Sequence, residues 1–395
     1  MAFKKKTALL LILGACVFAG CGNSSQTVTA PPVADVETGE EEVADAKAYE
    51  EFEESLSSDE APAPQSQFVV EKGYVSSYGA ERERDGDKVR SYLSGHMVPS
   101  SVGDRRPVAI MLNNIEDAMP MSGVSYADVL YECVVEGSLT RMMGVFENYD
   151  DLDKIGSVRS CRNYFVYYAL EFDSIYCHYG QSSYALPLLE EDYVDNLSGL
   201  AAIGDTVYYR TTDRVAPHNA YASAKGIKKG IEEMGYRNTY RDDYTGKFTF
   251  AKDDDPNDLT QEDSYDATYI EPGYKINKPH LEYNAEDKKY YRWQYGTEHV
   301  DDLNGEQLSF DNVILQHSSW ETIDDKGYLG FNCHGGGVMT YITRGKAVDG
   351  TWLSFGGEQG AVRYFDSDGE EIVLNQGKTL IEIIQDTESD KVVIR

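Results

Sequence analysis

The apolar and polar positions along this chain predict a strand-rich fold that begins near residue 106. Residues 107–112 are continuously apolar, which predicts a buried strand that ends at Asn113. Residues 127–136 instead alternate between an apolar face and a mixed face. That mixed face carries Asp128, Glu132 and Glu136.

A hairpin is predicted directly after the second strand. Gly137-Ser138 is typical of a two-residue turn, with residues 139–146 as the returning strand. That register pairs Val134 with Arg141, so we expect Arg141 to lie between Glu132 and Glu136 on one face. The sequence therefore predicts a basic side chain bracketed by two acidic ones.

Helical periodicity appears next and changes the expected fold class. Residues 162–172 carry an apolar stripe at helical spacing, and Ser160 is placed to cap that helix. A strand over 174–179 and helices over 187–191 and 223–234 continue the alternation. We therefore expect a mixed α/β domain over residues 106–245.

The second half of the chain is expected to be mostly β. A linker rich in Asp, Asn and Pro is predicted over 246–264, and a β domain over 265–395. The predicted fold class is therefore α+β, a mixed α/β domain followed by a mostly β domain. The strands that we expect in the second domain are 281–283, 290–294, 312–316, 338–343, 361–365 and 379–384.

The N-terminus indicates export and lipid attachment. Three Lys precede a short apolar run and a small-residue site before Cys21, which predicts a signal peptide over residues 1–20 and lipidation of Cys21. Cys16 is a rival acceptor, and an ordinary secretory peptide is the alternative. Residues 21–66 are predicted to be a disordered acidic tether, and 67–105 a transitional segment that packs in part onto the next domain.

The net charge limits the kinds of partner that we expect, and the cysteine spacing bears on disulfides. With 36 basic and 68 acidic residues the formal charge is −32, so nucleic acid is not an expected partner. The remaining cysteines, which show no CxxC spacing, are expected to be buried thiols without a disulfide framework. They are Cys133, Cys161, Cys177 and Cys333.

From about residue 105 to the C-terminus the chain resembles the YerB-type lipoprotein family. That resemblance implies two domains and a cell-envelope location, in a family without an established activity. The matching stretches are 106–114, 127–128, 131–132, 136–137, 140–141, 156, 158–160, 162, 178, 180, 216–219, 291–292, 299–301, 312–316, 350–352, 363–365 and 376–379.

Two arginines give the strongest local chemical signal. Arg159 and Arg162 flank a predicted helix start, where guanidinium groups and free backbone N–H groups together favour an anion such as phosphate or carboxylate. Arg141 is a further candidate, and we include Asn113 and Asp128 among the expected ligand-binding residues. The alternative is a structural ion network in which these arginines pair with Asp128, Glu132 or Glu136.

Catalytic candidates are also present. Glu132, Glu136, His178 and His218 could supply acid-base chemistry if they converged. Their spacing fits no tight metal motif, and we expect neither a metal nor a cofactor.

The sequence thus predicts a lipid-anchored protein on the extracytoplasmic face of the cell membrane. We expect it to bind an anionic envelope ligand or wall glycan in an accessory role, with an envelope protein as a further partner. The alternative function is an enzyme, a transferase or hydrolase, that acts on a wall polymer or a lipid-linked phosphate.

Overall fold

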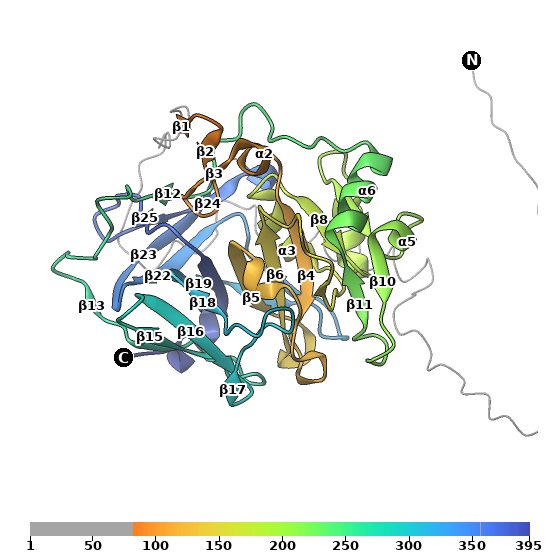
Figure 1. Ribbon diagram of the computed structural model, residues 1–395. Coiled ribbons are helices and arrows are strands. Elements are labelled where there is room, and N and C mark those ends of the chain that lie inside the picture. Colours follow the sequence, from red (N-terminus) through yellow and green to blue (C-terminus); the bar gives the residue numbers. More distant parts are fainter. Residues whose placement is uncertain (1–81, 356) are drawn as a thin grey trace, which may run out of the picture. The chain divides into compact units, whose positions relative to one another are not determined.

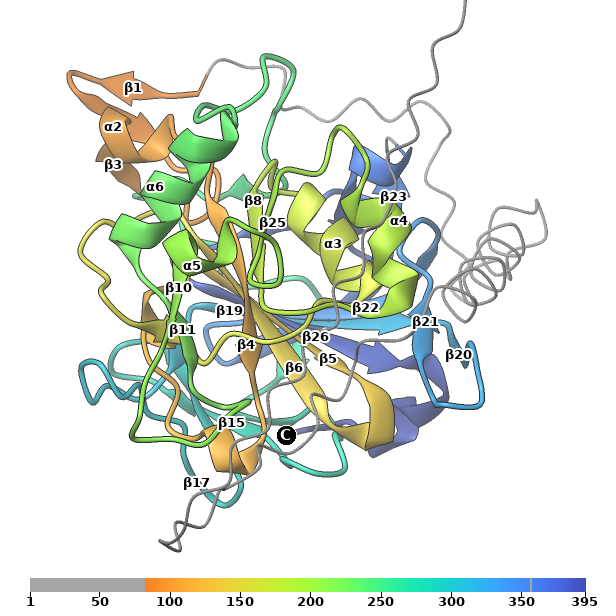
Figure 2. The same ribbon diagram turned by 90° about the vertical axis from the view of Figure 1, so that its right-hand side faces the viewer.

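A single large sheet runs through both halves of the chain in the computed structural model, which describes residues 82–355 and 357–395 (Figures 1 and 2). The predictions for residues 1–20, Cys21, 21–66 and 67–81 fall outside the described residues. In spatial order the strands of the 11-stranded sheet are β13 (Tyr265–Asp266), β23 (Lys346–Phe355), β22 (Gly336–Thr343), β19 (Asn312–Ser318), β26 (Thr379–Gln385), β5 (Val129–Val134), β6 (Thr140–Phe146), β4 (Val108–Asn113), β8 (Ile175–His178) and β9 (Asn196–Ser198), with β24 (Ala361–Phe365) beside β23.

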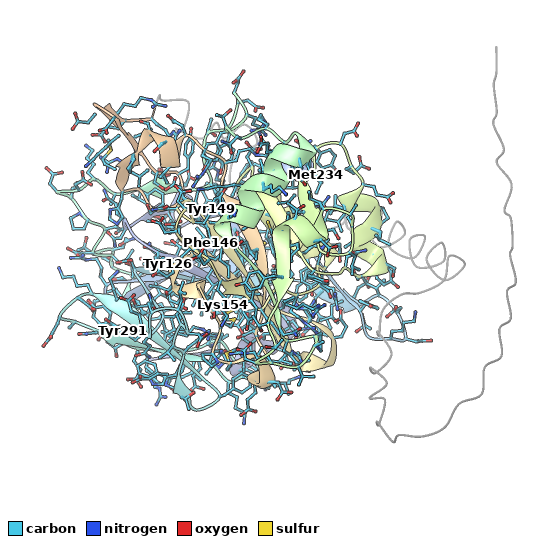
Figure 3. The ribbon with its side chains drawn as sticks, turned by 45° about the vertical axis from the view of Figure 1, so that its right-hand side comes forward. Tyr126, Phe146, Tyr149, Lys154, Met234 and Tyr291 are labelled. Atoms are coloured by element: carbon cyan, nitrogen blue, oxygen red, sulfur yellow. The ribbon has the colours of Figure 1, made fainter. Side chains whose placement is uncertain are left out.

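The N-terminal part of this sheet is buried on both faces. Every residue of β4, β5, β6 and β8 is buried, as the continuous apolar run of residues 107–112 predicts. Over one face lies α3 (Asn163–Leu170), whose Tyr168 ring stacks on Tyr131 of β5 with centroids 5.0 Å apart. Phe146 at the end of β6 lies in the core, whereas Met234 at the end of α6 (Ala224–Met234) lies at the surface (Figure 3).

The hairpin between β5 and β6 corrects the predicted register. Its loop holds three residues, 136–138, and the Val135 N–H donates to the Leu139 carbonyl at 2.8 Å. The extra loop residue places Cys133, rather than Val134, opposite Arg141. Because a shift of one residue moves every side chain to the other face, Arg141 does not lie between Glu132 and Glu136.

The helices lie close to where periodicity places them, with one correction. Arg162 is the N-cap residue of α3, so Ser160 does not cap it, and its hydroxyl instead donates to the Tyr179 carbonyl at 3.4 Å. Ser223 caps α6 by accepting from the Gly226 N–H. The other α-helices within the described residues are α2 (Ser100–Gly103), α4 (Leu186–Leu189) and α5 (Gly204–Val207).

The C-terminal half is mostly β, as predicted, and it adds a second sheet beside the large one. This six-stranded sheet consists of β17 (Thr297–Glu298), β16 (Lys289–Gln294), β15 (His280–Asn284), β14 (Tyr269–Glu271), β27 (Val393–Ile394) and β18 (Ser309–Phe310). The predicted α+β fold class is confirmed.

Four small sheets complete the described chain. They are β1 (Arg84–Asp85), β2 (Lys88–Arg90) and β3 (Met97–Pro99); β10 (Tyr208–Arg210), β11 (Ala220–Ala222) and β7 (Ile155–Gly156); β12 (Thr249–Phe250) with β25 (Val373–Leu374); and β20 (Trp320–Thr322) with β21 (Leu329–Phe331).

The two halves of the chain meet inside the large sheet. Near the C-terminus, β26 pairs in parallel with β5, and this register sets Glu382 directly opposite Glu132. Both carboxyl groups are fully buried. Such a pair is costly in an apolar core unless a cation or a shared proton offsets the repulsion.

Arg292 of β16 supplies that cation. Its guanidinium is fully buried and hydrogen-bonds to the Glu132 carboxylate, while Nη1 donates to Nδ1 of His299 at 2.5 Å. Two amides, Asn114 Nδ2 at 2.8 Å and Asn277 Nδ2 at 2.6 Å, also donate to Glu132. The network therefore satisfies one carboxylate with donors from three separate parts of the chain.

The second carboxyl, Glu382, is under strong pressure toward its neutral form. Burial and the adjacent charge of Glu132 raise the pKa of Glu382 well above its ordinary value. Burial together with the Arg292 charge lowers the pKa of His299 well below its ordinary value, so that imidazole is neutral. The cluster thus contains one ion pair, Glu132 with Arg292, beside two groups, Glu382 and His299, whose pKa shifts favour their neutral forms.

Replacing Arg292 with Met should destabilise the whole described fold. Removing one partner of a buried ion pair leaves an uncompensated charge and costs about 3–5 kcal/mol. Urea unfolding followed by tryptophan fluorescence measures this loss.

Lys275→Met is the matched control, because its pair with Glu388 lies at the surface and should contribute less than about 1 kcal/mol. A loss of stability in R292M no larger than in K275M would contradict the role assigned to the buried pair.

Candidate functional site

The candidate site lies where the carboxyl ends of β4 and β8 separate. The two strands pair in parallel from Val108 and Ile175 as far as Ile110 and Cys177. Beyond that point, residues 157–161 lie between them. The Arg159 N–H donates to the Met111 carbonyl at 3.1 Å, and the Arg159 carbonyl accepts from the Tyr179 N–H at 3.0 Å. These bonds keep residues 159–161 extended, which explains why α3 begins only at residue 163.

The register brings two predicted ligand-binding residues side by side. Asn113 on β4 lies directly opposite Arg141 on β6, so both side chains point to the same face of the sheet. The antiparallel bridge between Leu112 and Val158 places Ser157 on the other side of Asn113, so Arg141, Asn113 and Ser157 form one row across the sheet. Since side chains alternate along a strand, Glu132 points to the other face.

Arg141 is the most unusual group in the row. Its side chain is 8% exposed, and within residues 82–355 and 357–395 it makes one hydrogen bond, from Nη1 to the Ser160 carbonyl at 2.6 Å. No carboxylate in that part of the chain forms an ion pair with it. Burial and the charges of Arg162 and Arg159 lower the pKa of Arg141 to about 9, opposed by Glu136.

Arg162 and Glu136 form a closed pair beside Arg141. The Arg162 Nε and Nη2 atoms each donate to a different oxygen of Glu136 at 2.7 Å, and Nη1 donates to the Cys161 carbonyl at 2.8 Å. Burial alone would raise the pKa of Glu136, but the hydrogen bonds and charge of Arg162 outweigh it and lower that pKa. Arg162 therefore pairs with Glu136, as in the structural ion network that the sequence left open as an alternative.

The two candidate histidines differ in their surroundings. His218 belongs to the site, because Asn113 Nδ2 donates to its Nδ1 at 2.9 Å, which leaves the proton on Nε2. Burial and the Arg159 charge lower the pKa of His218. His178 is fully buried, with Nδ1 bonded to the Gly180 carbonyl at 2.8 Å and Nε2 at 3.3 Å from Asn196 Oδ1.

Asp128 lies at the opposite end of the sheet from Arg141. Its carboxylate accepts from the Glu147 N–H at 2.9 Å, and its carbonyl accepts from the Thr379 N–H. Burial raises the pKa of Asp128, and burial with the adjacent Asp128 charge raises the pKa of Glu147. Of the predicted residues, Asp128 therefore lies at the other end of the sheet and Glu132 on its other face. The register sets His178 on the same face as Arg141, but both of its ring nitrogens are bonded.

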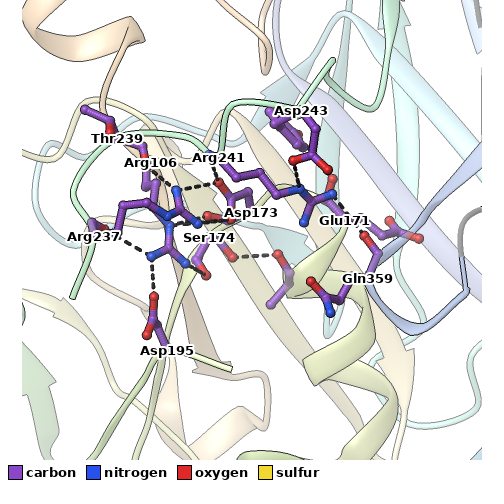
Figure 4. Close-up of polar contacts among 12 residues, drawn as sticks. Arg106, Glu171, Asp173, Ser174, Asp195, Arg237, Thr239, Arg241, Asp243 and Gln359 are labelled. Carbon is purple, nitrogen blue, oxygen red and sulfur yellow. Dashed lines mark hydrogen bonds and ion pairs between the residues drawn. The ribbon is translucent and has the colours of Figure 1, made fainter. Parts of the chain in front are cut away.

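Other arginines of this protein have guanidinium groups that bond to carboxylates as well as to carbonyl groups. Arg106 bonds to Asp195 and to the carbonyls of Asp173 and Ser174, and Arg237 donates to both oxygens of Asp173 at 2.6 and 2.9 Å (Figure 4). Charged donors are paired in this way across much of the core. Arg141 departs from that pattern, because its charge is buried without a carboxylate.

A cavity of about 520 Å³ lies away from this site, at the loop over residues 241–246. Its charged groups are engaged, since Arg241 pairs with Asp243 and donates to the Gln359 carbonyl. Glu171 at its base accepts from Lys247 Nζ at 2.6 Å. We therefore place the candidate binding chemistry at Arg141 rather than in this cavity.

Sequence reasoning missed several polar residues that shape the core and the site. The hydroxyl groups of Ser157 and Ser182 are buried and make no hydrogen bond within the described chain. Asn277 and Arg292, which fix Glu132, lie more than 140 residues from it in sequence. The prediction of buried thiols is confirmed for Cys133, Cys161, Cys177 and Cys333, which are all buried and form no disulfide within the described residues.

Two further observations concern metals and membranes. Across residues 82–355 and 357–395, no three His, Cys, Asp or Glu side chains are grouped so that they could hold a metal ion. In the same residues, no helix has the length and apolar character needed to cross a membrane.

This chain matches a two-domain family, with one matching domain in each half of the chain. Residues 93–237 match the N-terminal domain, and residues 270–381 the C-terminal domain, of the family described as "Protein of unknown function (DUF3048)". The chain belongs to this family.

The YerB protein of Bacillus subtilis is similar to this chain in sequence and in structure. The chain is 30% identical over 304 residues to "Putative lipoprotein YerB" of strain 168, covering 76% of this chain and 88% of that protein. It also matches the crystal structure of the YerB protein with a TM-score of 0.67 at 28% identity, covering 78% of this chain and 99% of the other. The resemblance found in the sequence is therefore confirmed.

The Asp128 and Glu147 carboxyl pair predicts a pH-dependent stability difference. A carboxyl whose pKa is raised by folding binds its proton more tightly in the folded state, so its contribution is lost as pH rises above the unfolded value of about 4. Glu147→Gln removes one such titration. Measured by urea unfolding, E147Q should gain stability relative to the unmodified protein between pH 5 and pH 8.

The exposed Glu262→Gln is the control, and its stability difference should not change with pH. An E147Q difference that stays constant from pH 5 to pH 8 would show that the carboxyl pair is ionised in the folded protein.

Proposed function

We propose that this protein is a lipid-anchored, extracytoplasmic binding protein that holds an anionic ligand of the cell envelope at Arg141, in an accessory role. The observation that carries the proposal is the Arg141 guanidinium, buried to 92% and bonded to a single carbonyl. A buried cation without a counter-charge is unfavourable. A bound anion would supply that counter-charge.

Neighbouring groups support an anion rather than a cation. Arg159, which is half-buried, and the bonded pair of Arg162 with Glu136 surround Arg141. His218 offers an N–H donor at the same end of β4. The place also fits, because open sheets with parallel strands bind ligands at the carboxyl ends of those strands.

The anchor in this proposal is a lipid on Cys21. The support for it is the charged and apolar pattern of residues 1–20 and the lipoprotein name of the Bacillus relative. Two acyl chains bind a membrane stably where a single chain does not. The strongly acidic chain would then work close to the wall as a binding protein for its polymers.

The contacts favour binding over catalysis at this site. Of the four acid-base candidates, Glu132 is bonded to Arg292, Glu136 to Arg162, and His178 to Gly180 and Asn196. His218 is the one candidate beside Arg141 whose Nε2 is available to a ligand. An enzyme would need its acid and base within reach of one substrate atom, and the bonded carboxylates do not offer that.

Retention on purified cell-wall polymer tests the proposal. The full chain in detergent is incubated with wall sacculi and sedimented, and the bound fraction is measured. Arg141→Gln and Arg159→Gln should each lower the affinity at least about tenfold, because truncating one partner of a buried, hydrogen-bonded charge pair costs about 2–5 kcal/mol.

Arg395→Gln is the matched control, since it removes the same charge from a surface pair with Glu271. Its retention should equal that of the unmodified protein. Equal retention of R141Q, R159Q and the unmodified protein would refute an anion site at Arg141.

A further inference from the structure

A column of stacked rings crosses the outer face of the six-stranded sheet. Buried and half-exposed residues alternate along β16, so Arg292 faces the core and Trp293 faces outward. On the outer face the Trp293 ring stacks on His280 of β15, with the ring centroids 5.2 Å apart and the planes at 6°. His280 in turn stacks on Tyr269 of β14, with centroids 5.3 Å apart. The three rings therefore stand side by side in the order of their strands.

The chain's own C-terminal residue occupies the end of the column at Tyr269. Arg395 follows β27, the strand that pairs with β14, and its guanidinium carbon lies 4.5 Å from the centroid of the Tyr269 ring. Arg395 Nη2 lies 3.8 Å from a Glu271 oxygen, and the Tyr269 hydroxyl donates to the same oxygen at 2.6 Å. A ring face with a carboxylate beside it thus holds a guanidinium.

The other end of the column has a ring face and a carboxylate but no guanidinium. β17 pairs with β16 on the side away from β15, and the register sets Glu298 directly opposite Trp293. Within residues 82–355 and 357–395, neither a second ring nor a cation stacks on the indole face away from His280. In the same residues the exposed Glu298 side chain forms no ion pair. β17 lies at the lower edge of the coloured ribbon in both views, so this end of the column is at the surface (Figures 1 and 2).

We infer that the Trp293 and Glu298 end of the column binds an arginine side chain of a partner protein, presented on an extended basic segment. This surface is separate from the Arg141 site, and the inference does not depend on that site. A guanidinium is attracted both to the π face of an indole and to a carboxylate, as Arg395 is at the opposite end. Arginine is favoured over lysine, because its planar guanidinium stacks on a ring while its N–H groups bond to a carboxylate.

The charge of the outer face also favours a basic partner. Glu282 is exposed beside the column, opposite Tyr291, which lies at the surface and donates its hydroxyl to Asp287 at 2.6 Å (Figure 3). The outward-facing Lys289 bonds to both oxygens of Asp311 at 3.0 Å, so its charge is compensated. With a formal charge of −32, the whole chain attracts cations and repels an acidic partner.

The stacking geometry distinguishes this site from a glycan-binding platform. Sugar rings stack on exposed aromatic faces, and a chain of sugars gains from several such faces in a row. Here His280 has a ring on both of its faces, and Tyr269 lies between His280 and Arg395. Trp293 offers one uncovered face with a carboxylate beside it, which fits a single cationic side chain.

Binding of a fluorescently labelled, acetylated tetra-arginine amide to the full chain in non-ionic detergent tests the inference. Fluorescence polarisation gives the affinity at an ionic strength of about 0.15 M, where exposed charges more than about 8 Å apart are largely screened. Trp293→Leu should lower the affinity about two- to fivefold, the range of an exposed cation–π contact. Glu298→Gln should lower it about twofold, because it removes the carboxylate of an exposed ion pair. The corresponding tetra-lysine peptide should bind less tightly than tetra-arginine.

Two exposed positions outside the six-stranded sheet provide matched controls. Glu262→Gln removes the same charge from the loop before β13, and Tyr126→Leu removes a ring that is 40% exposed. Both controls should keep the affinity of the unmodified protein. The urea midpoint of each variant checks its fold, and because Glu298 is exposed, E298Q keeps the test valid if W293L does not fold.

Three outcomes would overturn the inference. The first is the absence of saturable tetra-arginine binding to the unmodified protein. The second is an affinity that is unchanged in a folded W293L, or that falls equally in E298Q and E262Q, which would indicate general attraction to an acidic chain. The third is displacement of the peptide by chitotetraose, with chitotetraose binding that depends on Trp293 and peptide binding that does not depend on Glu298. That result would assign the face to a glycan.

Discussion

The buried ion pair between Glu132 and Arg292 joins residues that lie 160 positions apart in the chain. Glu132 sits in the middle of β5, and Arg292 comes from the second sheet, so the pair ties the N-terminal half to the C-terminal half at the centre of the molecule. The parallel pairing of β26 with β5 brings Glu382 against the same carboxylate. One of these two acids is paired with Arg292, and burial with the adjacent charge raises the pKa of the other, which favours its neutral form.

Other contacts extend the same junction between the halves. Asp301 is fully buried, and its two oxygens accept from the Gly123 N–H at 2.8 Å and the Ser125 N–H at 2.7 Å. Tyr274 donates to the carbonyls of Glu132 and Ile383 on the two joined strands. Although the family is described as two domains, its N-terminal strands therefore share one sheet with the C-terminal ones.

This junction holds β5 and β6 in position and so determines what surrounds Arg141. With Glu132 committed to Arg292 on one face, the acid that the sequence places nearest to Arg141 is not available to it. Glu136 is likewise committed to Arg162. The structure thus holds a guanidinium in the sheet while directing both neighbouring carboxylates to other arginines, and this arrangement is the physical basis of the proposed anion site.

Local patterns in the sequence predict the strands and helices well, because burial and periodicity are properties of neighbouring residues. The strand ending at Asn113, the helix capped by Ser223 and the hairpin of β15 and β16 all follow from such patterns. The register of the β5 and β6 hairpin does not, since Gly137-Ser138 fits both a two-residue and a three-residue loop.

The partners of the acidic residues could not be predicted for a different reason. Arg292, Asn277 and Glu382 meet Glu132 only through tertiary pairing, and no local spacing reports it. The Arg cluster was predicted as a group, but which arginine is paired and which is not depends on that same tertiary geometry.

A crystal structure of the protein grown with inorganic phosphate is the most direct measurement of the central claim. The account predicts density for a tetrahedral anion whose oxygens lie within hydrogen-bond distance of the Arg141 guanidinium, with the Arg162 and Glu136 pair intact beside it. The account would be contradicted by an Arg141 side chain bonded to a carboxylate of the protein itself, with the anion bound elsewhere or absent.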